Sequence, residues 1–282
     1  MSTRELGING FSWHLDADTL KREAEMVLAL GYRWAYGDMG VWAPGALETA
    51  HEVFRGSGLP IWSTHGVTGV QEWDFDVDAA FDRMSEQVRR IGSLEIGNVT
   101  YHTMVNDTNR EAPEVVSERR VRFVSRFHEL FGRLTEVAEP LGVSINVENI
   151  EGEFDSAYRT AEEIFTIIDP VASDVMGVCL DSGHAHMSNV SVADMARELG
   201  PRLREVHFHD NLGKADRHMV VGIGSIEWVD VIDALDEINF TSPVVFEWTG
   251  TYWSDLPFED VARAHYFNWR QFESMVDAIR AK

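Results

Sequence analysis

The sequence predicts an α/β protein, a (β/α)8 TIM barrel that forms a single domain over residues 1–282. Short β-rich runs alternate with helical segments along the chain, at roughly 30–40 residues per unit. Several runs, such as residues 175–180 and 244–246, are almost continuously apolar, which is typical of parallel strands covered on both faces. The length of 282 residues also suits this fold, for which about 250 residues is typical.

The first half of the chain contains four predicted units. We expect strands over residues 6–13, 33–37, 60–66 and 95–103, and helices over residues 17–30, 46–54, 78–91 and 113–138. Apolar residues recur along the fourth helix at a spacing that predicts one buried face: Val124, Phe127, Phe131 and Leu134.

The second half repeats the pattern four times. We expect strands over residues 143–150, 175–181, 203–209 and 243–248, and helices over residues 161–168, 192–199, 228–238 and 258–281. A doubly wound open sheet is the competing fold, but it usually has a glycine-rich turn after its first strand. This chain has Phe11-Ser12-Trp13-His14 at that place, so the barrel is favoured.

Composition and charge exclude several classes of protein. The chain has 47 acidic and 24 basic side chains, and its net charge of −23 repels nucleic acids and anionic membranes. No apolar run approaches the ~18 residues that a membrane span needs, and no signal peptide is expected. The single cysteine, Cys179, has no disulfide partner within the chain. We therefore expect a cytoplasmic protein.

Histidines gather where the predicted strands end. Three of the eleven, His51, His128 and His265, fall inside predicted helices. The other eight fall at or just past the end of a strand: His14, His65, His102, His184, His186, His207, His209 and His218. Active sites of (β/α)8 barrels lie at the carboxyl ends of the strands, so these side chains are candidates for one site.

Three carboxylates join the histidines at the same level. Glu148, Asp181 and Glu247 end predicted strands five, six and eight. An unpaired charge in an apolar strand costs several kcal/mol of desolvation, so each needs a partner. A divalent metal is the partner that also explains the histidines.

The seventh strand and the segment after it add further candidates. His207 and His209 lie two residues apart and therefore share one face of a strand. Asp216 and His218 follow in a loop, two residues apart, and could both bind one metal ion. The glycine turn at residues 222–228 leads into a helix, where its backbone amides can hold a phosphate or a sugar hydroxyl.

These motifs resemble those of the superfamily of xylose-isomerase-like and endonuclease-IV-like barrels, which contains sugar isomerases, epimerases and abasic-site endonucleases. The resemblance spans essentially the whole chain. The motifs that carry it are Asn146-Val147-Glu148-Asn149, Leu180-Asp181-Ser182-Gly183-His184, Val206-His207-Phe208-His209-Asp210-Asn211, Asp216-Arg217-His218, the glycine turn at 222–228, and Phe246-Glu247.

The resemblance implies a metal ion held by Glu148, Asp181, His207 and Glu247. The endonuclease branch adds two further metals. In this chain, one of them would be held by His65 and His102, with Glu148 bridging. The other would be held by a set of three residues: His184, Asp216 and His218. Sugar-isomerase relatives use several of these positions to grip substrate hydroxyls instead.

The favoured hypothesis is a sugar or keto-polyol isomerase or epimerase that depends on a divalent metal, Mn²⁺, Co²⁺, Mg²⁺ or Zn²⁺. Glu148 and Glu247 would remove and return a proton next to a carbonyl, through an enediolate. Dehydration of a keto-polyol begins with the same step.

The expected substrate contacts are Trp13, His209, Arg217 and Trp248, although the two tryptophans can equally pack in the core. The closing helix, with Tyr266, Phe267, Trp269 and Phe272, can cover the barrel or contact a second subunit.

Two alternatives remain open. The first is a three-zinc phosphodiesterase that acts on abasic DNA, but it predicts basic loops, whereas residues 74–78 and 151–155 are acidic and only three lysines occur. The second is a non-catalytic or partner subunit on the same barrel, because a fold does not determine function. The complete ligand set argues against it.

Overall fold

Eight parallel strands form a closed barrel in the computed structural model of the chain, which describes residues 3–13, 16–68, 70, 74–102, 113–151, 158–249 and 256–282. The strands follow one another round the barrel in sequence order, and β8 pairs with β1 so that Val244 lies opposite Leu6. The predicted (β/α)8 barrel is therefore confirmed.

All eight predicted strands are present. They are β1 (Leu6–Ile8), β2 (Trp34–Gly37), β3 (Ile61–Gly66), β4 (Asn98–Tyr101), β5 (Ser144–Glu148), β6 (Met176–Asp181), β7 (Leu203–Phe208) and β8 (Val244–Phe246). The first is shorter than expected because the chain turns at Gly10, whose φ is +91°. A Cβ at Gly10 would lie 2.6 Å from the Trp248 ring, so the turn and the close packing both require glycine.

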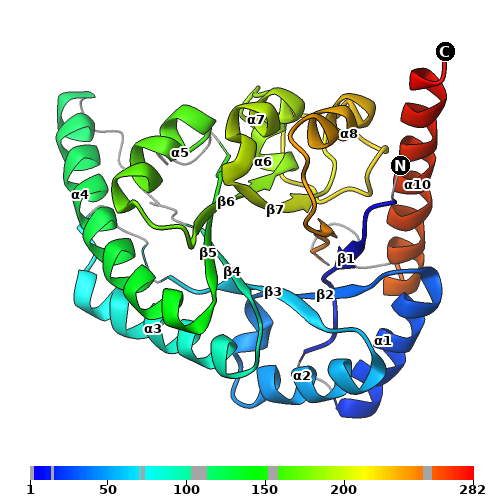
Figure 1. Cartoon of the computed structure of the whole chain (residues 1–282), viewed down its shortest axis with the longest axis horizontal. Coiled ribbons are helices and arrows are strands. Elements are labelled where there is room, and N and C mark those ends of the chain that lie inside the picture. Colours follow the sequence, from blue (N-terminus) through cyan, green and yellow to red (C-terminus); the bar gives the residue numbers. More distant parts are fainter. Residues whose placement is uncertain are drawn as a thin grey trace.

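The helices form an outer ring around the barrel, as Figure 1 shows. They are α1 (Ala17–Leu30), α2 (Ala46–Ser57), α3 (Val77–Ser93), α4 (Pro113–Ala138), α5 (Ala161–Ile168), α6 (Ser182–Met187), α7 (Val192–Leu199), α8 (Trp228–Glu237) and α10 (Phe258–Arg280). Short 3-10 turns also occur: η1 (Met39–Trp42), η2 (Glu139–Leu141), η3 (Asp169–Val171) and η4 (Gly200–Arg202). Helix α6 was not predicted. None of the helices within the described ranges is long and apolar enough to cross a membrane.

Polar residues cap the starts of several helices. The side chains of Asp16, Asp76 and Ser191 each accept a hydrogen bond from a backbone amide in the first turn of α1, α3 and α7. Thr160 and Glu163 form a reciprocal capping box at the start of α5. These bonds satisfy amides that have no partner within the helix, which explains why the helices begin where they do.

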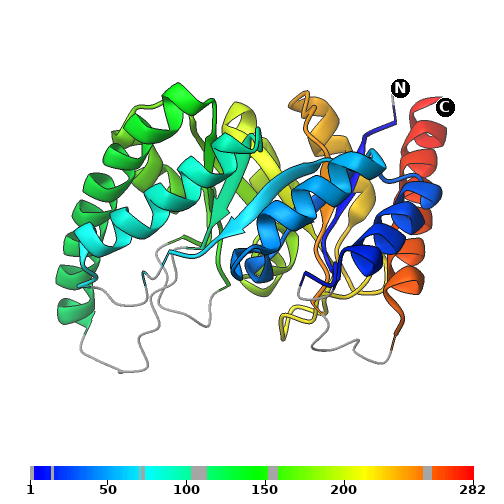
Figure 2. The same ribbon diagram turned by 90° about the horizontal axis from the view of Figure 1, so that it is seen from below.

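The closing helix α10 packs against the barrel and against its neighbours α1 and α8. Trp269 is fully buried, with its ring 5.7 Å from that of Phe208 and 5.8 Å from that of Phe246. Tyr266 and Phe272 pack partly against the same core, whereas Phe267 is exposed. Figure 2 shows that α10 brings the end of the chain beside its start, at the face of the barrel where β1 begins.

His265 lies on the buried side of α10 and takes no part in the barrel mouth. Its ring stacks on Phe246 at 4.9 Å, and neither ring nitrogen has a hydrogen-bond partner. Burial, together with the nearby His209 and His218, lowers the pKa of His265 from 6.5 to about 3. The folded protein therefore holds this imidazole in its neutral form.

Replacement of His265 by Phe should make the protein less sensitive to acid. Between pH 6.5 and about pH 3, the unfolded wild type binds a proton at His265 that the folded protein does not bind. The wild type therefore loses about 1.4 kcal/mol of stability per pH unit at this residue as the pH falls through that range. Urea denaturation at pH 7.5 and pH 5.0 should show that the wild type loses about 2 kcal/mol more than His265→Phe between those values. Equal losses would contradict this account.

Candidate metal centre

The four residues expected to hold a metal converge at the carboxyl ends of four strands. Glu148 ends β5, Asp181 ends β6, His207 lies near the end of β7, and Glu247 directly follows β8. Each offers one ligand atom, and these atoms all lie within 4.8 Å of one another. All four side chains are buried. Residues 148, 181, 207 and 247 are called the quartet below.

The quartet fits a divalent cation. Glu148 Oε2 and His207 Nδ1 lie 3.0 Å apart, yet both atoms are buried without a hydrogen-bond partner. Glu247 Oε2 lies 3.8 Å from the same ring nitrogen. Buried polar atoms without partners are costly, and a cation with oxygen and nitrogen ligands would satisfy them together.

The two glutamates of the quartet differ in their proton affinity. Burial alone would raise the pKa of Glu148, but the neighbouring His102 and His207 hold it well below its usual value. For Glu247, burial is the largest effect and raises the pKa, although His207 and His218 oppose it. Glu148 is therefore ionised, while Glu247 accepts a proton more readily. Such divergence between two carboxylates is typical of acid and base pairs.

Asp181 joins the quartet to helix α6, which begins directly after β6. Its Oδ1 accepts a hydrogen bond from the His184 amide at 2.7 Å, which caps the helix. Its Oδ2 lies 3.0 Å from His209 Nε2. Burial would raise the pKa of Asp181, but His184 and His209 lower it. The cap explains why a helix starts here and why His184 turns towards the barrel mouth.

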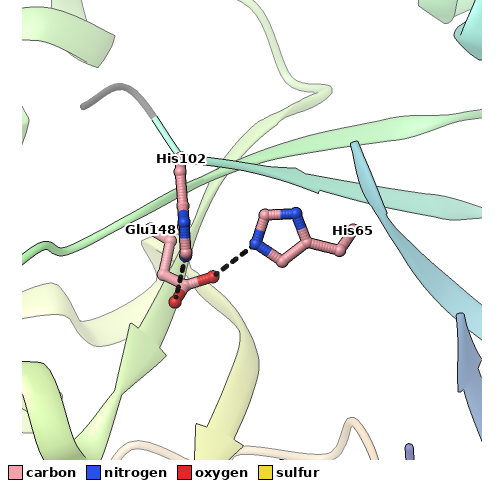
Figure 3. Close-up of side chains that lie close together, drawn as sticks. All are labelled: His65, His102 and Glu148. Carbon is pink, nitrogen blue, oxygen red and sulfur yellow. Dashed lines mark hydrogen bonds and ion pairs between the residues drawn. The ribbon is translucent and has the colours of Figure 1, made fainter. Parts of the chain in front are cut away.

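His65 and His102 approach Glu148 from β3 and from the residue after β4 (Figure 3). His102 Nε2 lies 2.8 Å from Glu148 Oε1, and His65 Nε2 lies 3.9 Å from Glu148 Oε2. The three can offer ligand atoms within 4.8 Å of one another. Burial, together with the neighbouring His102, lowers the pKa of His65 to about 3, so this ring is a neutral ligand or hydrogen-bonding group.

His184, Asp216 and His218 are linked through the Asp216 carboxylate. Asp216 Oδ2 lies 2.8 Å from His218 Nε2 and 3.6 Å from His184 Nε2. The His218 ring also stacks on His209 at 3.9 Å, and these two histidines form a compact group with Glu247. Burial would lower the pKa of His184, but Asp181 and Asp216 raise it well above its usual value. All nine positions that the resemblance implies therefore lie around one barrel mouth.

The quartet reaches a cavity of about 600 Å³ through one of its members. Glu247 lines the cavity directly, and the side chains of His65, His102, His184, Asp216 and His218 reach it as well. A space of this size suits a small-molecule ligand with several polar groups. The cavity and the buried quartet together mark the mouth of the barrel as a candidate active site.

Most of the chain matches one protein family. Residues 4–266 match the family model described as xylose isomerase-like TIM barrel. The chain belongs to this family. Two curated relatives are a D-psicose 3-epimerase of Enterocloster bolteae, 30% identical over 128 residues, and an inosose isomerase of Bacillus velezensis, 27% identical over 146 residues. These alignments cover 45% and 48% of this chain, and 40% and 51% of the two relatives. The matched region is thus about half, or less, of each relative's length.

Several solved structures share the fold of this chain. A D-tagatose 3-epimerase-like protein has a TM-score of 0.79 with 17% identity, covering 97% of this chain and 98% of its own. The IolI protein, solved with a bound zinc atom, has a TM-score of 0.74 with 18% identity, covering 96% of this chain and 97% of its own. At this identity the likeness establishes the fold alone.

The four expected substrate contacts lie in different surroundings. Trp248 lines the cavity and stacks on Phe258. His209 is fully buried between Asp181 and the His218 ring. Trp13 packs in an aromatic cluster with Phe11 and Phe54 and does not line the cavity. Arg217 is exposed and is not among the residues that line the cavity.

Two further histidines were expected near the strand ends. His14 lies outside the described residues, and His186 forms a hydrogen bond with Ser225 on an exposed surface.

The glycine turn at residues 222–228 does not offer the amides that the sequence suggested. The amides of Gly222 and Ile226 donate hydrogen bonds to the buried Asp210 carboxylate, at 2.9 and 3.2 Å. Trp228 Nε1 donates to the same carboxylate at 2.8 Å. Asp210 therefore organises the loop that carries Asp216 and His218, and these amides are already used.

Two site residues were missed by sequence reasoning. Glu151 Oε2 lies 3.2 Å from His184 Nε2 and lines the cavity. Glu205 is fully buried on β7, with Oε1 3.2 Å from His207 Nε2. The period of two along a strand is a signal that places Glu205 on the same face as His207.

A divalent ion should stabilise the protein through the quartet. Zn²⁺ or Mn²⁺ at about 100 times its Kd, added to chelator-treated protein, should raise the free energy of unfolding by about 2.7 kcal/mol. Asp181→Asn should lose most of this gain while keeping the helix cap, because asparagine also caps helices well. Glu198→Gln, on the exposed face of α7, is the control and should behave as the wild type. The measurement is urea denaturation with and without metal. Stability that no divalent ion changes would refute a metal site.

Proposed function

We propose that this protein is a divalent-metal-dependent isomerase or epimerase of sugars or keto-polyols. The observation that carries the proposal is the buried quartet, whose Glu247 lines a cavity of about 600 Å³ and whose two glutamates lie at the ends of β5 and β8. The relatives named as D-psicose 3-epimerase and inosose isomerase support the same class of reaction.

Glu148, Asp181, His207 and Glu247 would hold the ion, and their mixed ligands suit Mn²⁺, Co²⁺, Mg²⁺ or Zn²⁺. Such an ion supplies a Lewis acid that polarises a substrate carbonyl and acidifies the neighbouring C–H bond. Glu148 and Glu247 would then exchange that proton: one carboxylate removes it from the carbon, and the other or the same carboxylate returns it.

The other side chains of the mouth orient the substrate. His184 lines the cavity and carries a positive charge because Asp181 and Asp216 raise its pKa, so it can donate a hydrogen bond to a substrate oxygen. Trp248 offers a flat apolar surface at the cavity wall, on which a sugar ring can pack. Dehydration of a keto-polyol would use the same proton abstraction.

Glu247→Gln should abolish turnover while the fold is retained. The substitution keeps the size of the side chain but removes its ability to exchange a proton and weakens a metal ligand. We expect kcat to fall by at least ~10² on a panel of free ketoses and keto-polyols, with an unchanged far-UV circular dichroism spectrum. Glu129→Gln, an exposed residue of α4, is the matched control and should retain activity. An active Glu247→Gln enzyme would disprove the scheme with two glutamates.

A multi-zinc phosphodiesterase is the second candidate, and the cluster of His65, His102 and Glu148 favours it. The net charge of −23 opposes it, because DNA phosphates would be repelled. Metal content separates the two proposals. Protein purified without chelators should contain about one divalent ion per chain if it is an isomerase or epimerase, as measured by elemental mass spectrometry. A content near three zinc ions, with cleavage of abasic DNA, would favour the phosphodiesterase.

A further inference from the structure

A carboxylate lies beneath the quartet, inside the barrel. Glu205 is on β7, two residues before His207, and its side chain is fully buried. Its Oε2 accepts hydrogen bonds from Ser63 Oγ at 2.9 Å, from Thr100 Oγ1 at 3.0 Å and from Asn146 Nδ2 at 2.9 Å. Its Oε1 lies 3.2 Å from His207 Nε2.

The donors to Glu205 form a polar layer with a regular origin. Ser63, Thr100 and Asn146 lie on β3, β4 and β5. Each lies two residues before a residue of the mouth: His65, His102 and Glu148 in turn. Because side chains alternate along a strand, residues two apart both face the barrel interior. The earlier residue of each pair lies one layer deeper in the barrel than the later one. Each of these strands therefore contributes one residue to the mouth and one to the support of Glu205.

This layer departs from the usual filling of a barrel. Barrel interiors are dominated by bulky branched apolar residues. A buried carboxylate costs several kcal/mol of desolvation unless its oxygens are satisfied. Here three neutral donors satisfy Oε2, while Oε1 faces only the His207 ring among the bonds formed by the described residues. His207 is thus the member of the quartet to which Glu205 is bonded.

We infer that Glu205 is a positioning residue that holds His207 in the tautomer that can bind the metal. When the ring is neutral, its single proton stays on Nε2 and is donated to Glu205 Oε1. Nδ1 is then left with its lone pair directed at the space shared with Glu148 and Glu247, where it has no hydrogen-bond partner. A carboxylate bonded to the far nitrogen orients a metal-binding histidine and makes it a better ligand. The inference rests on the metal site in the proposed function.

Glu205→Gln tests the inference with the smallest change of shape. A glutamine oxygen can still accept from Ser63, Thr100 and Asn146, but its amide group would then face His207 Nε2 as a donor. The neutral ring would be driven to protonate Nδ1, the nitrogen that faces the metal. We expect Zn²⁺ to bind about 10–100-fold more weakly, as measured by competition with a chromogenic chelator.

Thr100→Val is the matched control. It removes one donor to Oε2 with almost no change of volume and leaves the bond between Glu205 and His207 in place. Both variants should lower the melting temperature, since each disturbs the buried layer, but only Glu205→Gln should weaken Zn²⁺ binding. Equal Zn²⁺ affinity in Glu205→Gln and the wild type would overturn the inference, and so would an equal loss in Thr100→Val.

A measurement on the wild type does not depend on the folding of any variant. Nuclear magnetic resonance of the Zn²⁺-loaded protein with ¹⁵N-labelled histidine should show His207 with a protonated Nε2 and a metal-bound Nδ1. A metal-bound Nε2 would overturn the inference. None of these tests uses a sugar, so inactivity on the ketose panel with intact Zn²⁺ binding would reject the proposed function alone. Normal turnover together with full Zn²⁺ affinity in Glu205→Gln would reject only the role of Glu205.

Discussion

Three carboxylates converge in the mouth of the barrel, and their mutual repulsion is the constraint to which the surrounding structure is adapted. Glu148, Asp181 and Glu247 are buried, with ligand atoms within 4.8 Å of one another and of His207. Burial removes the water that would screen these charges, so like charges at this distance are costly. Neighbouring histidines reduce this electrostatic repulsion at each of the three acids. A divalent cation would reduce it further.

The imidazoles are not distributed evenly around the three acids. His102 and His207 lower the pKa of Glu148, and His184 and His209 lower that of Asp181. Glu247 faces the cavity with less compensation, and burial raises its pKa. One arrangement of charges therefore both stabilises the mouth and separates the proton affinities of the two glutamates. This separation links the stability of the site to the chemistry proposed for it.

Support for the mouth comes from the layers around it. Asp181 starts helix α6 and so directs His184 towards the cavity. Asp210 gathers the amides of Gly222 and Ile226 and thereby shapes the loop that carries Asp216 and His218. Glu205 and its three donors lie below, with a bond to His207. Buried carboxylates thus recur as organisers of the site, each satisfied by donors from different segments of the chain.

Sequence reasoning alone predicted the barrel and placed eight histidines and three carboxylates at or just past the ends of its strands. Alternation of strands and helices is a local property, and a barrel with parallel strands necessarily brings their carboxyl ends to one rim. These side chains could therefore be grouped at one rim as candidates. The choice of Glu148, Asp181, His207 and Glu247 among them came from the resemblance to xylose isomerase-like barrels.

The tertiary structure decided what depends on contacts between distant segments. Arg217 and Trp13 are both expected substrate contacts. Arg217 is exposed on a loop, whereas Trp13 packs against Phe11 and Phe54. The periodicity of strands predicts neither the path of a loop nor the packing of a ring. The role of Glu205 is visible only once three other strands place their donors around it. The sequence by itself determined which residues of a strand share one face, since that follows from a period of two along each strand. Only the closed barrel decided which of them touch, because the stagger between strands sets the height of each side chain.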